Sequence, residues 1–288
     1  MTTALTPARP GAGARTAFGA LAARETRRFV LNPVFLFTVA FTASWTWIGR
    51  GTAVTDVTNV NAFPAIFLGG FGMSAAYWLT RSMHASEPVV GVTPLTSPAR
   101  TAALCAVAIV PFGFGCLTLL AFLHFHPAGE PAYAMFSPSD RIAVLAGQIV
   151  VPALGGPLLG IMLGRWVRFR GAAFVLFLAL YGWVSLVAVV SASDADTVPV
   201  AALRLFAAFT FFALHSDAGG VTAWSGSPWF FLCWQLALCV IVVLAALLRG
   251  AEGQVRTRIV LALTVTGAAA PVMLALTAAG GFTHPAGS

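Results

Sequence analysis

The sequence is poor in residues able to carry out chemistry, and those it has stand between its long apolar segments. The seven apolar segments delimited below contain no acidic or basic side chain, so no buried proton-transfer pair or ion path is predicted. No His-Glu-x-x-His or Gly-x-Ser-x-Gly pattern occurs, and the chain has no lysine with which to complete a nucleotide-binding P-loop. We therefore expect neither a catalytic site nor a bound nucleotide in this chain.

Candidate metal ligands are His124 and His126, with Glu130 four residues further on. Residues two apart on a helix do not face each other, so these side chains would meet only on an extended segment. The four cysteines all lie inside apolar segments without C-x-x-C spacing, and we interpret them as packing residues. No metal or other cofactor is expected to be bound by this chain.

Two amides and a stripe of glycines are the remaining features of the apolar segments. Gln148 and Gln235 are the only amides there, and they predict either an interhelical hydrogen bond or a contact with a polar group of a passing substrate. Gly156, Gly160 and Gly164 recur every four residues, a spacing that lets another helix approach closely. The stripe indicates packing within one subunit, with a subunit interface or a translocation path as the alternatives.

Composition places the chain in the class of all-α polytopic membrane proteins. It is 59% hydrophobic and 9% charged, with a mean hydropathy of +0.88, whereas soluble domains are usually about 25% charged. The net charge of +7 would suit nucleic acid, but the arginines lie at the ends of apolar segments and not on a face with interleaved aromatic residues. The lipid bilayer, and not a nucleic acid, is therefore the expected surrounding.

Apolar segments of about 20 residues match the thickness of a bilayer core and predict six or seven transmembrane helices. The segments are residues 33–49, 62–80, 101–123, 142–164, 171–192, 228–248 and 259–280. Residues 1–15 show no periodicity and predict a disordered cytoplasmic tail. Residues 16–282 are expected to form a single transmembrane domain.

A basic stretch precedes the first apolar segment and predicts an amphipathic helix lying on the membrane surface. Arg27 and Arg28 fall on its polar face, while Glu25 falls among apolar residues. Asn32 is placed to cap a new helix that begins at Pro33, where the missing N–H costs nothing. The sequence around Arg27 and Arg28 is similar to a twin-arginine export signal. Such a signal would precede a soluble domain, whereas more apolar segments follow here.

Residues 198–214 are apolar but contain Arg204, so hydropathy alone does not decide whether they cross the bilayer. If they do not cross, 13 arginines lie on the side of the N-terminus and two on the other side; if they cross, the counts become 10 and five. Arginines concentrate on the cytoplasmic side of membrane proteins, which favours the first count. We therefore expect a re-entrant or interfacial hairpin on the outer side and a cytoplasmic N-terminus.

The connection between the second and third segments combines one acidic residue with prolines. Glu87 is followed by Pro94 and Pro98, and Ser97 is placed to cap the third transmembrane helix, in which Arg100 falls in the first turn. An ordinary inner connector anchored by arginines would have this composition. A loop stiffened in this way is equally suited to transmit force.

Three features, in this order, resemble the type-2 class of ATP-binding cassette (ABC) transporter permeases: the basic surface helix running into Asn32-Pro33, the acidic residue followed by Pro-Leu-Thr-Ser-Pro-Ala-Arg, and the outer hairpin before the sixth span. The resemblance covers residues 18–248. It implies a permease subunit of an exporter in a bacterial cell membrane, which encloses a path for a lipophilic or amphiphilic substrate together with a second, identical or different, permease subunit. ATP would be bound by a separate cytoplasmic ATPase subunit. The segment 259–280 departs from the six spans typical of the family.

In that family the N-terminal helix and the loop between the second and third spans contact the ATPase. The matching residues here are Glu25, Arg27, Arg28, Glu87, Pro94, Pro98 and Arg100. Glu25 is expected to pair with an arginine of a cytoplasmic loop or of the ATPase, because an unpaired charge at the membrane surface is costly. A non-transporting scaffold or sensor that docks another cytoplasmic protein is the alternative, and the absence of charges in the spans disfavours a secondary transporter.

Overall fold

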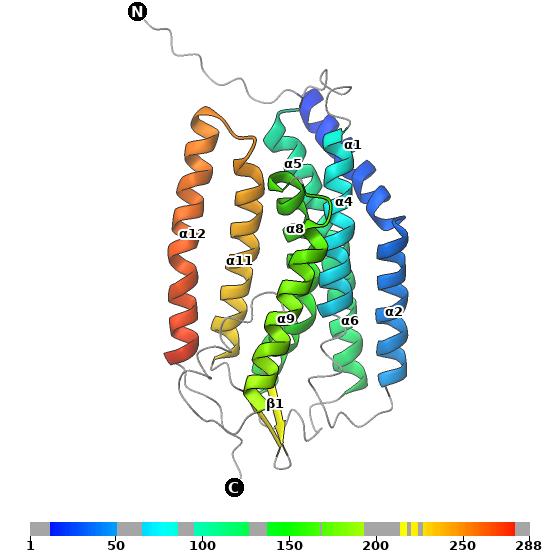
Figure 1. Cartoon of the computed structure of the whole chain (residues 1–288), viewed down its shortest axis with the longest axis vertical. Coiled ribbons are helices and arrows are strands. Elements are labelled where there is room, and N and C mark those ends of the chain that lie inside the picture. The colour runs from blue at the N-terminus through cyan, green and yellow to red at the C-terminus, as the bar shows by residue number, and fades with distance from the viewer. Residues whose placement is uncertain are drawn as a thin grey trace, which may run out of the picture.

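The computed structural model describes residues 12–50, 65–85, 95–126, 137–167, 169–192, 214–217, 220–223 and 227–279. In this part of the chain, long helices stand side by side in a bundle, with the N-terminal helix crossing one end (Figure 1). Four helical stretches are long and apolar enough to cross a membrane, and a bent pair at the N-terminus makes a fifth. The prediction of a helical chain with several helices long and apolar enough to span a membrane is confirmed.

The helices follow one another along the chain. Their bounds are α1 Ala12–Val30, α2 Pro33–Gly49, the π-helix η1 Ala65–Phe71 with α4 Gly72–Ala85, α5 Ser97–Cys105 with η2 Ala106–Ala108 and α6 Ile109–Phe125, α7 Pro138–Leu145 with the π-helix η4 Ala146–Val150 and α8 Val151–Trp166, α9 Ala172–Ala192, α11 Pro228–Leu248 and α12 Gly253–Ala279. Each predicted segment thus coincides with a helix. The stretches that pass the length and hydropathy test alone are Ser97–Phe125, Pro138–Trp166, Pro228–Leu248 and Gly253–Ala279. That all seven segments cross the bilayer stays a prediction.

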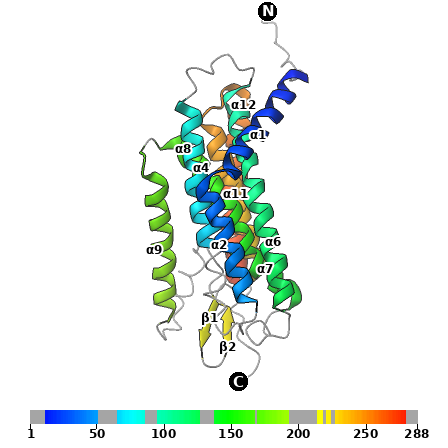
Figure 2. The same ribbon diagram turned by 90° about the vertical axis from the view of Figure 1, so that its right-hand side faces the viewer.

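Large apolar side chains cover the outside of the bundle. Phe174 on α9, Leu117 on α6 and Leu261 on α12 are 62%, 63% and 64% exposed. Figure 2 shows α9 standing to one side of the other helices. Soluble monomers rarely expose apolar patches of this extent, whereas lipid tails cover them without cost. The outer surface therefore fits a protein embedded in a membrane.

The connection between α9 and α11 leaves and returns at the same end of the bundle (Figure 1). At that end β1 (Leu214–Asp217) pairs antiparallel with β2 (Gly220–Ala223), a short hairpin that the all-α prediction did not include. The predicted re-entrant hairpin, residues 198–214, lies outside the described residues except for Leu214. α9 and α11 run in opposite directions (Figure 1), as expected if residues 198–214 do not cross the bilayer.

The predicted cap at the start of α2 is confirmed and coincides with a sharp bend. The Asn32 side chain accepts a hydrogen bond from the Val34 backbone N–H at 2.9 Å, and Pro33 is the first helical residue. The axes of Arg15–Val30 and Pro33–Gly49 differ by 63°. Phe29 and Phe35, both buried, pack across the corner with ring centroids 4.6 Å apart. Local backbone chemistry and one aromatic contact therefore set the angle between α1 and α2.

α8 is the central helix, and its glycine stripe lies against the second segment of the same chain. In the most apolar part of the α7–α8 stretch 83% of the residues are buried, whereas in the most apolar part of α12 only 11% are. A Cβ atom on Gly156 would lie 2.1 Å from the Gly69 carbonyl oxygen, and one on Gly160 would lie 2.1 Å from the Met73 carbonyl oxygen. The backbones of α8 and of η1–α4 are therefore in direct contact. Among the alternatives for the stripe, the structure shows packing within the chain.

Gly160→Leu is expected to lower the Tm of the purified protein strongly, because the side chain has no room between α8 and α4. Overpacking a close contact costs about 1–3 kcal/mol, and here a backbone must move. Gly113→Leu is the matched control, since a Cβ atom at Gly113 in α6 would meet nothing within 4 Å. Thermal unfolding in detergent measures both. Equal Tm values for the two variants would contradict the close contact.

Candidate functional site

The arginines gather at the end of the bundle that α1 crosses. In the part of the chain that the structure describes, eleven arginines belong to α1, to the ends of helices at this end or to the turns between them, and two lie at the opposite end. The eleven are Arg15, Arg24, Arg27, Arg28, Arg81, Arg100, Arg165, Arg170, Arg249, Arg256 and Arg258. The two are Arg50 and Arg141. We call this end the arginine-rich end.

An ion pair on α1 also links this helix to α4. Arg28 Nη1 donates to both oxygens of the Glu25 carboxylate, at 3.0 and 3.3 Å, and Arg28 Nη2 donates to Ser82 Oγ at 3.1 Å. Glu25 is 2% exposed although it belongs to a surface helix. The expectation that Glu25 pairs with an arginine from another segment is wrong for the described residues: its partner is three residues along the same helix, where side chains are neighbours.

A second polar contact joins three helices at the same end. Arg165, 7% exposed at the end of α8, donates through Nη2 to Ser97 Oγ at the start of α5 at 2.9 Å. Gly250, in the turn after α11, packs so closely that a Cβ atom there would lie 2.1 Å from Ser97 Oγ and 2.8 Å from Arg165 Nη2. The Arg165 guanidinium thus connects α8 with the start of α5 and with the turn between α11 and α12.

This arrangement corrects the predicted helix cap. Thr96, and not Ser97, caps α5, with its hydroxyl accepting from the Ala99 backbone N–H at 3.4 Å. Thr96 has the extended backbone of a capping residue, at φ −66° and ψ 156°. The Ser97 hydroxyl is engaged by Arg165 instead. The sequence held no signal for this, because the two residues are 68 positions apart.

A third contact fixes α4 against the turn between α8 and α9. The fully buried Tyr77 donates its hydroxyl hydrogen to the Phe169 carbonyl oxygen, and Arg81 Nη1 donates to the Tyr77 hydroxyl oxygen at 3.1 Å. With the Arg28 and Arg165 contacts, hydrogen bonds and close packing now connect α1, α4, α5, α8 and α11.

The other predicted coupling residues are placed only in part. Arg27 is exposed on α1, while Pro98 and Arg100 are half-buried in the first turn of α5. Glu87 and Pro94 lie outside the described residues. The structure therefore brings the N-terminal helix next to one flank of the predicted loop but does not place the loop itself.

The two buried amides lie in the core, remote from the arginine-rich end. Gln148 is 1% exposed in η4, and Gln235 is fully buried in α11. A Cβ atom on Gly147 would lie 3.4 Å from Gln235 Oε1, so η4 and α11 meet here. The predicted interhelical hydrogen bond is absent for Gln235, since neither its Nε2 nor its Oε1 atom has a partner among the described residues.

The metal site considered from the sequence finds no support in the described residues. No three His, Cys, Asp or Glu side chains in the described ranges come together in a way that would hold an ion. His126 is buried at the end of α6, where its carbonyl oxygen accepts a hydrogen bond from Arg141, and Glu130 lies outside the described residues. The contact with Arg141 closes the C-terminus of α6 against α7.

Comparison with known proteins does not identify a family: no family model matches the chain, and neither a curated protein nor a solved structure matches it. The function is therefore inferred from the helix arrangement and from the contacts at the arginine-rich end. One of these contacts joins the two elements predicted to contact the ATPase. It is the attachment of α1, the N-terminal helix, to α4 and α5, the helices on either side of the predicted loop.

Arg28→Gln is expected to destabilise the protein by about 1–3 kcal/mol, because it leaves the buried Glu25 carboxylate without its guanidinium. The cost stays below that of a fully buried pair because the Arg28 side chain is 43% exposed. Arg24→Gln is the matched control: it removes an exposed charge from the same helix and should change stability by no more than about 0.5 kcal/mol.

Chemical denaturation in mixed micelles measures both variants and the double variant Glu25→Gln, Arg28→Gln, which should recover most of the loss. If Arg24→Gln and Arg28→Gln unfold at the same denaturant concentration, the pair does not hold α1 in place.

Proposed function

We propose that this chain is the permease subunit of an ABC exporter in a bacterial cell membrane. It forms, with a second permease subunit, the path for a lipophilic or amphiphilic substrate, and a separate cytoplasmic ATPase subunit supplies the energy. The observation that carries the proposal is the joining of α1 to the end of α4 and the start of α5. The Arg28 contact with Ser82 and the packing of α1 on α5 make one surface from the two elements that dock the ATPase in type-2 permeases.

Energy has to reach this chain from outside. The sequence lacks the lysine of a P-loop, and its apolar segments lack the acidic residues that proton or sodium coupling uses. The described network at the arginine-rich end is suited to receive force, because displacement of α1 pulls on α4 through Arg28 and presses on α5 directly. α4 in turn contacts α8 along the glycine stripe, so the motion reaches the centre of the bundle.

The arginine-rich end is assigned to the cytoplasm on the basis of its charge. Arginines flanking short loops are retained on the cytoplasmic side during insertion. This assignment puts α1 and the turns after α4, α8 and α11 where a soluble ATPase can reach them. The β1–β2 hairpin and the start of α7 then face outward.

Single reactive cysteines test this orientation in a background in which the four native cysteines are alanine. A cysteine replacing the exposed Ser139, at the start of α7, should react with a membrane-impermeant maleimide on intact cells. A cysteine replacing the exposed Glu252, between α11 and α12, should react only after permeabilisation. The inverse pattern would reverse the orientation, and reaction of both on intact cells would exclude a spanning bundle.

Co-purification tests the partner. The tagged full chain, extracted from its native host in a mild detergent, should retain an ATPase that contains Walker motifs. Recovery of a cytoplasmic partner without such motifs would contradict the exporter and favour a scaffold or sensor.

Charge reversal then locates the docking surface. Glu87→Arg should reduce the retained ATPase at least about tenfold, because reversing one charge at a close contact costs several kcal/mol. Glu252→Arg is the matched control, since it reverses an exposed acid at the same end of the bundle that belongs neither to α1 nor to the connection between α4 and α5. ATPase activity in vesicles containing both subunits should follow retention. If neither Glu87→Arg nor the double change Pro94→Ala, Pro98→Ala alters retention, the connection between α4 and α5 is not the docking surface.

A further inference from the structure

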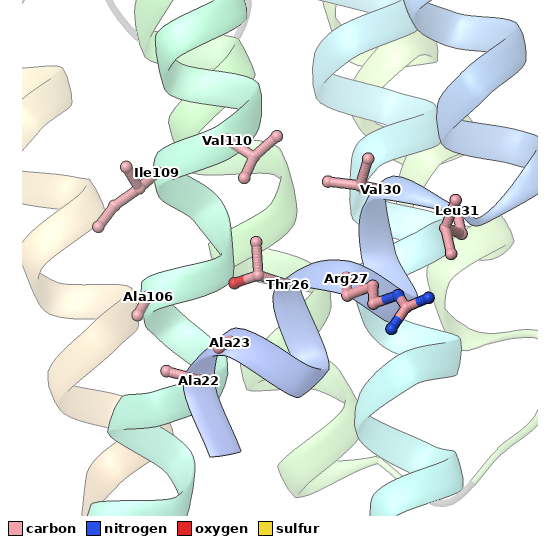
Figure 3. Close-up of a pocket in the computed structure, with 9 residues that line it drawn as sticks. All are labelled: Ala22, Ala23, Thr26, Arg27, Val30, Leu31, Ala106, Ile109 and Val110. Carbon is pink, nitrogen blue, oxygen red and sulfur yellow. The ribbon is translucent and has the colours of Figure 1, made fainter. Parts of the chain in front are cut away.

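An open groove lies in the angle between α1 and α2, with the third helical stretch as its other wall. Its volume is about 640 Å³. Figure 3 shows α1 along one side, with Thr26 and Val30 lining the groove, and Ala106, Ile109 and Val110 on the opposite side. The bend at Asn32 creates this space, because α1 leaves the bundle at 63° to α2 instead of continuing along it.

The walls and the rim of the groove differ in chemistry. Apart from Thr26 and Arg27, all lining residues carry only hydrocarbon side chains. Arg27 lies at the end of the groove near Leu31, and its guanidinium points away from Ala106 and Ile109 on the opposite side (Figure 3). Arg28 is committed to Glu25 and Ser82, whereas Arg27 is exposed and forms no ion pair with any described residue. The groove thus combines an apolar interior with one available cation.

The surroundings of the groove select the kind of molecule that enters it. Leu31 and Ile109, at its two edges, are 60% and 66% exposed, so the groove opens outward from the bundle. It lies where α1 turns into α2. If α1 lies on the membrane surface and α2 enters the bilayer, this corner is at the depth where lipid headgroups meet acyl chains. Its volume is within the range of ligand sites, roughly 300–1,000 Å³. A molecule with a long apolar chain and an anionic head matches both parts of it.

We propose that the groove binds an anionic phospholipid of the surrounding bilayer. One acyl chain lies between Val30 and Ile109, and the phosphate accepts hydrogen bonds from the Arg27 guanidinium, whose planar donors suit phosphate oxygens. The bound lipid braces α1 against the third helical stretch. This inference does not depend on the proposed transport function, because it needs only the membrane location and the groove.

Photo-cross-linking tests the site in the full chain, reconstituted as single copies in nanodiscs. The discs contain phosphatidylcholine and a minor fraction of phosphatidylglycerol with a diazirine in its acyl chain. Adducts located by mass spectrometry should concentrate on residues 22–31 and 106–110, relative to the outer face of α12. Unlabelled phosphatidylglycerol should compete about tenfold better than phosphatidylcholine, because the choline cation of phosphatidylcholine offsets the charge of the phosphate and repels the Arg27 guanidinium.

Two matched pairs of variants separate this site from general attraction to a basic surface. Arg27→Gln should abolish the preference for phosphatidylglycerol, and Arg24→Gln, which removes an exposed charge that does not line the groove, should keep it. Ala23→Trp should fill the groove and reduce its adducts at least about fivefold, while Ala20→Trp, outside the lining, should not. Adducts on α12 should stay constant in all four variants.

Four results would overturn the proposal. Equal adducts on the groove and on α12, or equal effects of Arg24→Gln and Arg27→Gln, would reduce the interaction to ordinary contact with bulk lipid. Adducts that appear in the groove only after removal of residues 1–11 would make the N-terminal segment the occupant. Groove adducts that form in discs holding one copy but disappear in discs holding two copies would make a second chain the occupant.

Discussion

The close contact between α8 and the η1–α4 stretch is the interaction on which the rest of the structure depends. In a membrane, lipid tails solvate apolar side chains as well as another helix does, so helices associate through packing and hydrogen bonds. Gly156 and Gly160 permit this packing by letting the carbonyl oxygens of Gly69 and Met73 touch the facing backbone. Because α8 is the most buried helix, its position against α4 determines where the surrounding helices can lie.

The same contact assembles the arginine-rich end. With α4 and α8 side by side, Arg81 at the end of α4 meets Tyr77 and the turn after α8, while Arg165 at the end of α8 reaches α5. α1 then attaches to this assembled platform through Arg28. Among the described residues, arginine contacts of this kind lie at the two ends of the bundle, where the side chains can also reach water.

α1 divides its side chains among three surroundings, so the proposed docking surface and the proposed lipid groove can occupy different faces of one helix. Glu25 and Phe29 face the bundle and are buried. Arg24 points away from it and is exposed. Thr26 and Val30 face the groove that the bend at Asn32 opens. A period of 3.6 residues distributes neighbouring positions around the axis in this way, so adjacent residues belong to different faces.

The sequence by itself determined the helices, the helix cap at Asn32 and the unequal distribution of arginines. These features depend on hydrophobic length, on capping chemistry and on charge, all of which are local or additive along the chain. Only the tertiary structure decided that Glu25 pairs with Arg28, that Arg165 takes the Ser97 hydroxyl, and that Gln235 has no hydrogen-bond partner among the described residues. Such contacts depend on which helix faces meet, and many pairings of apolar helices satisfy the same sequence pattern equally well.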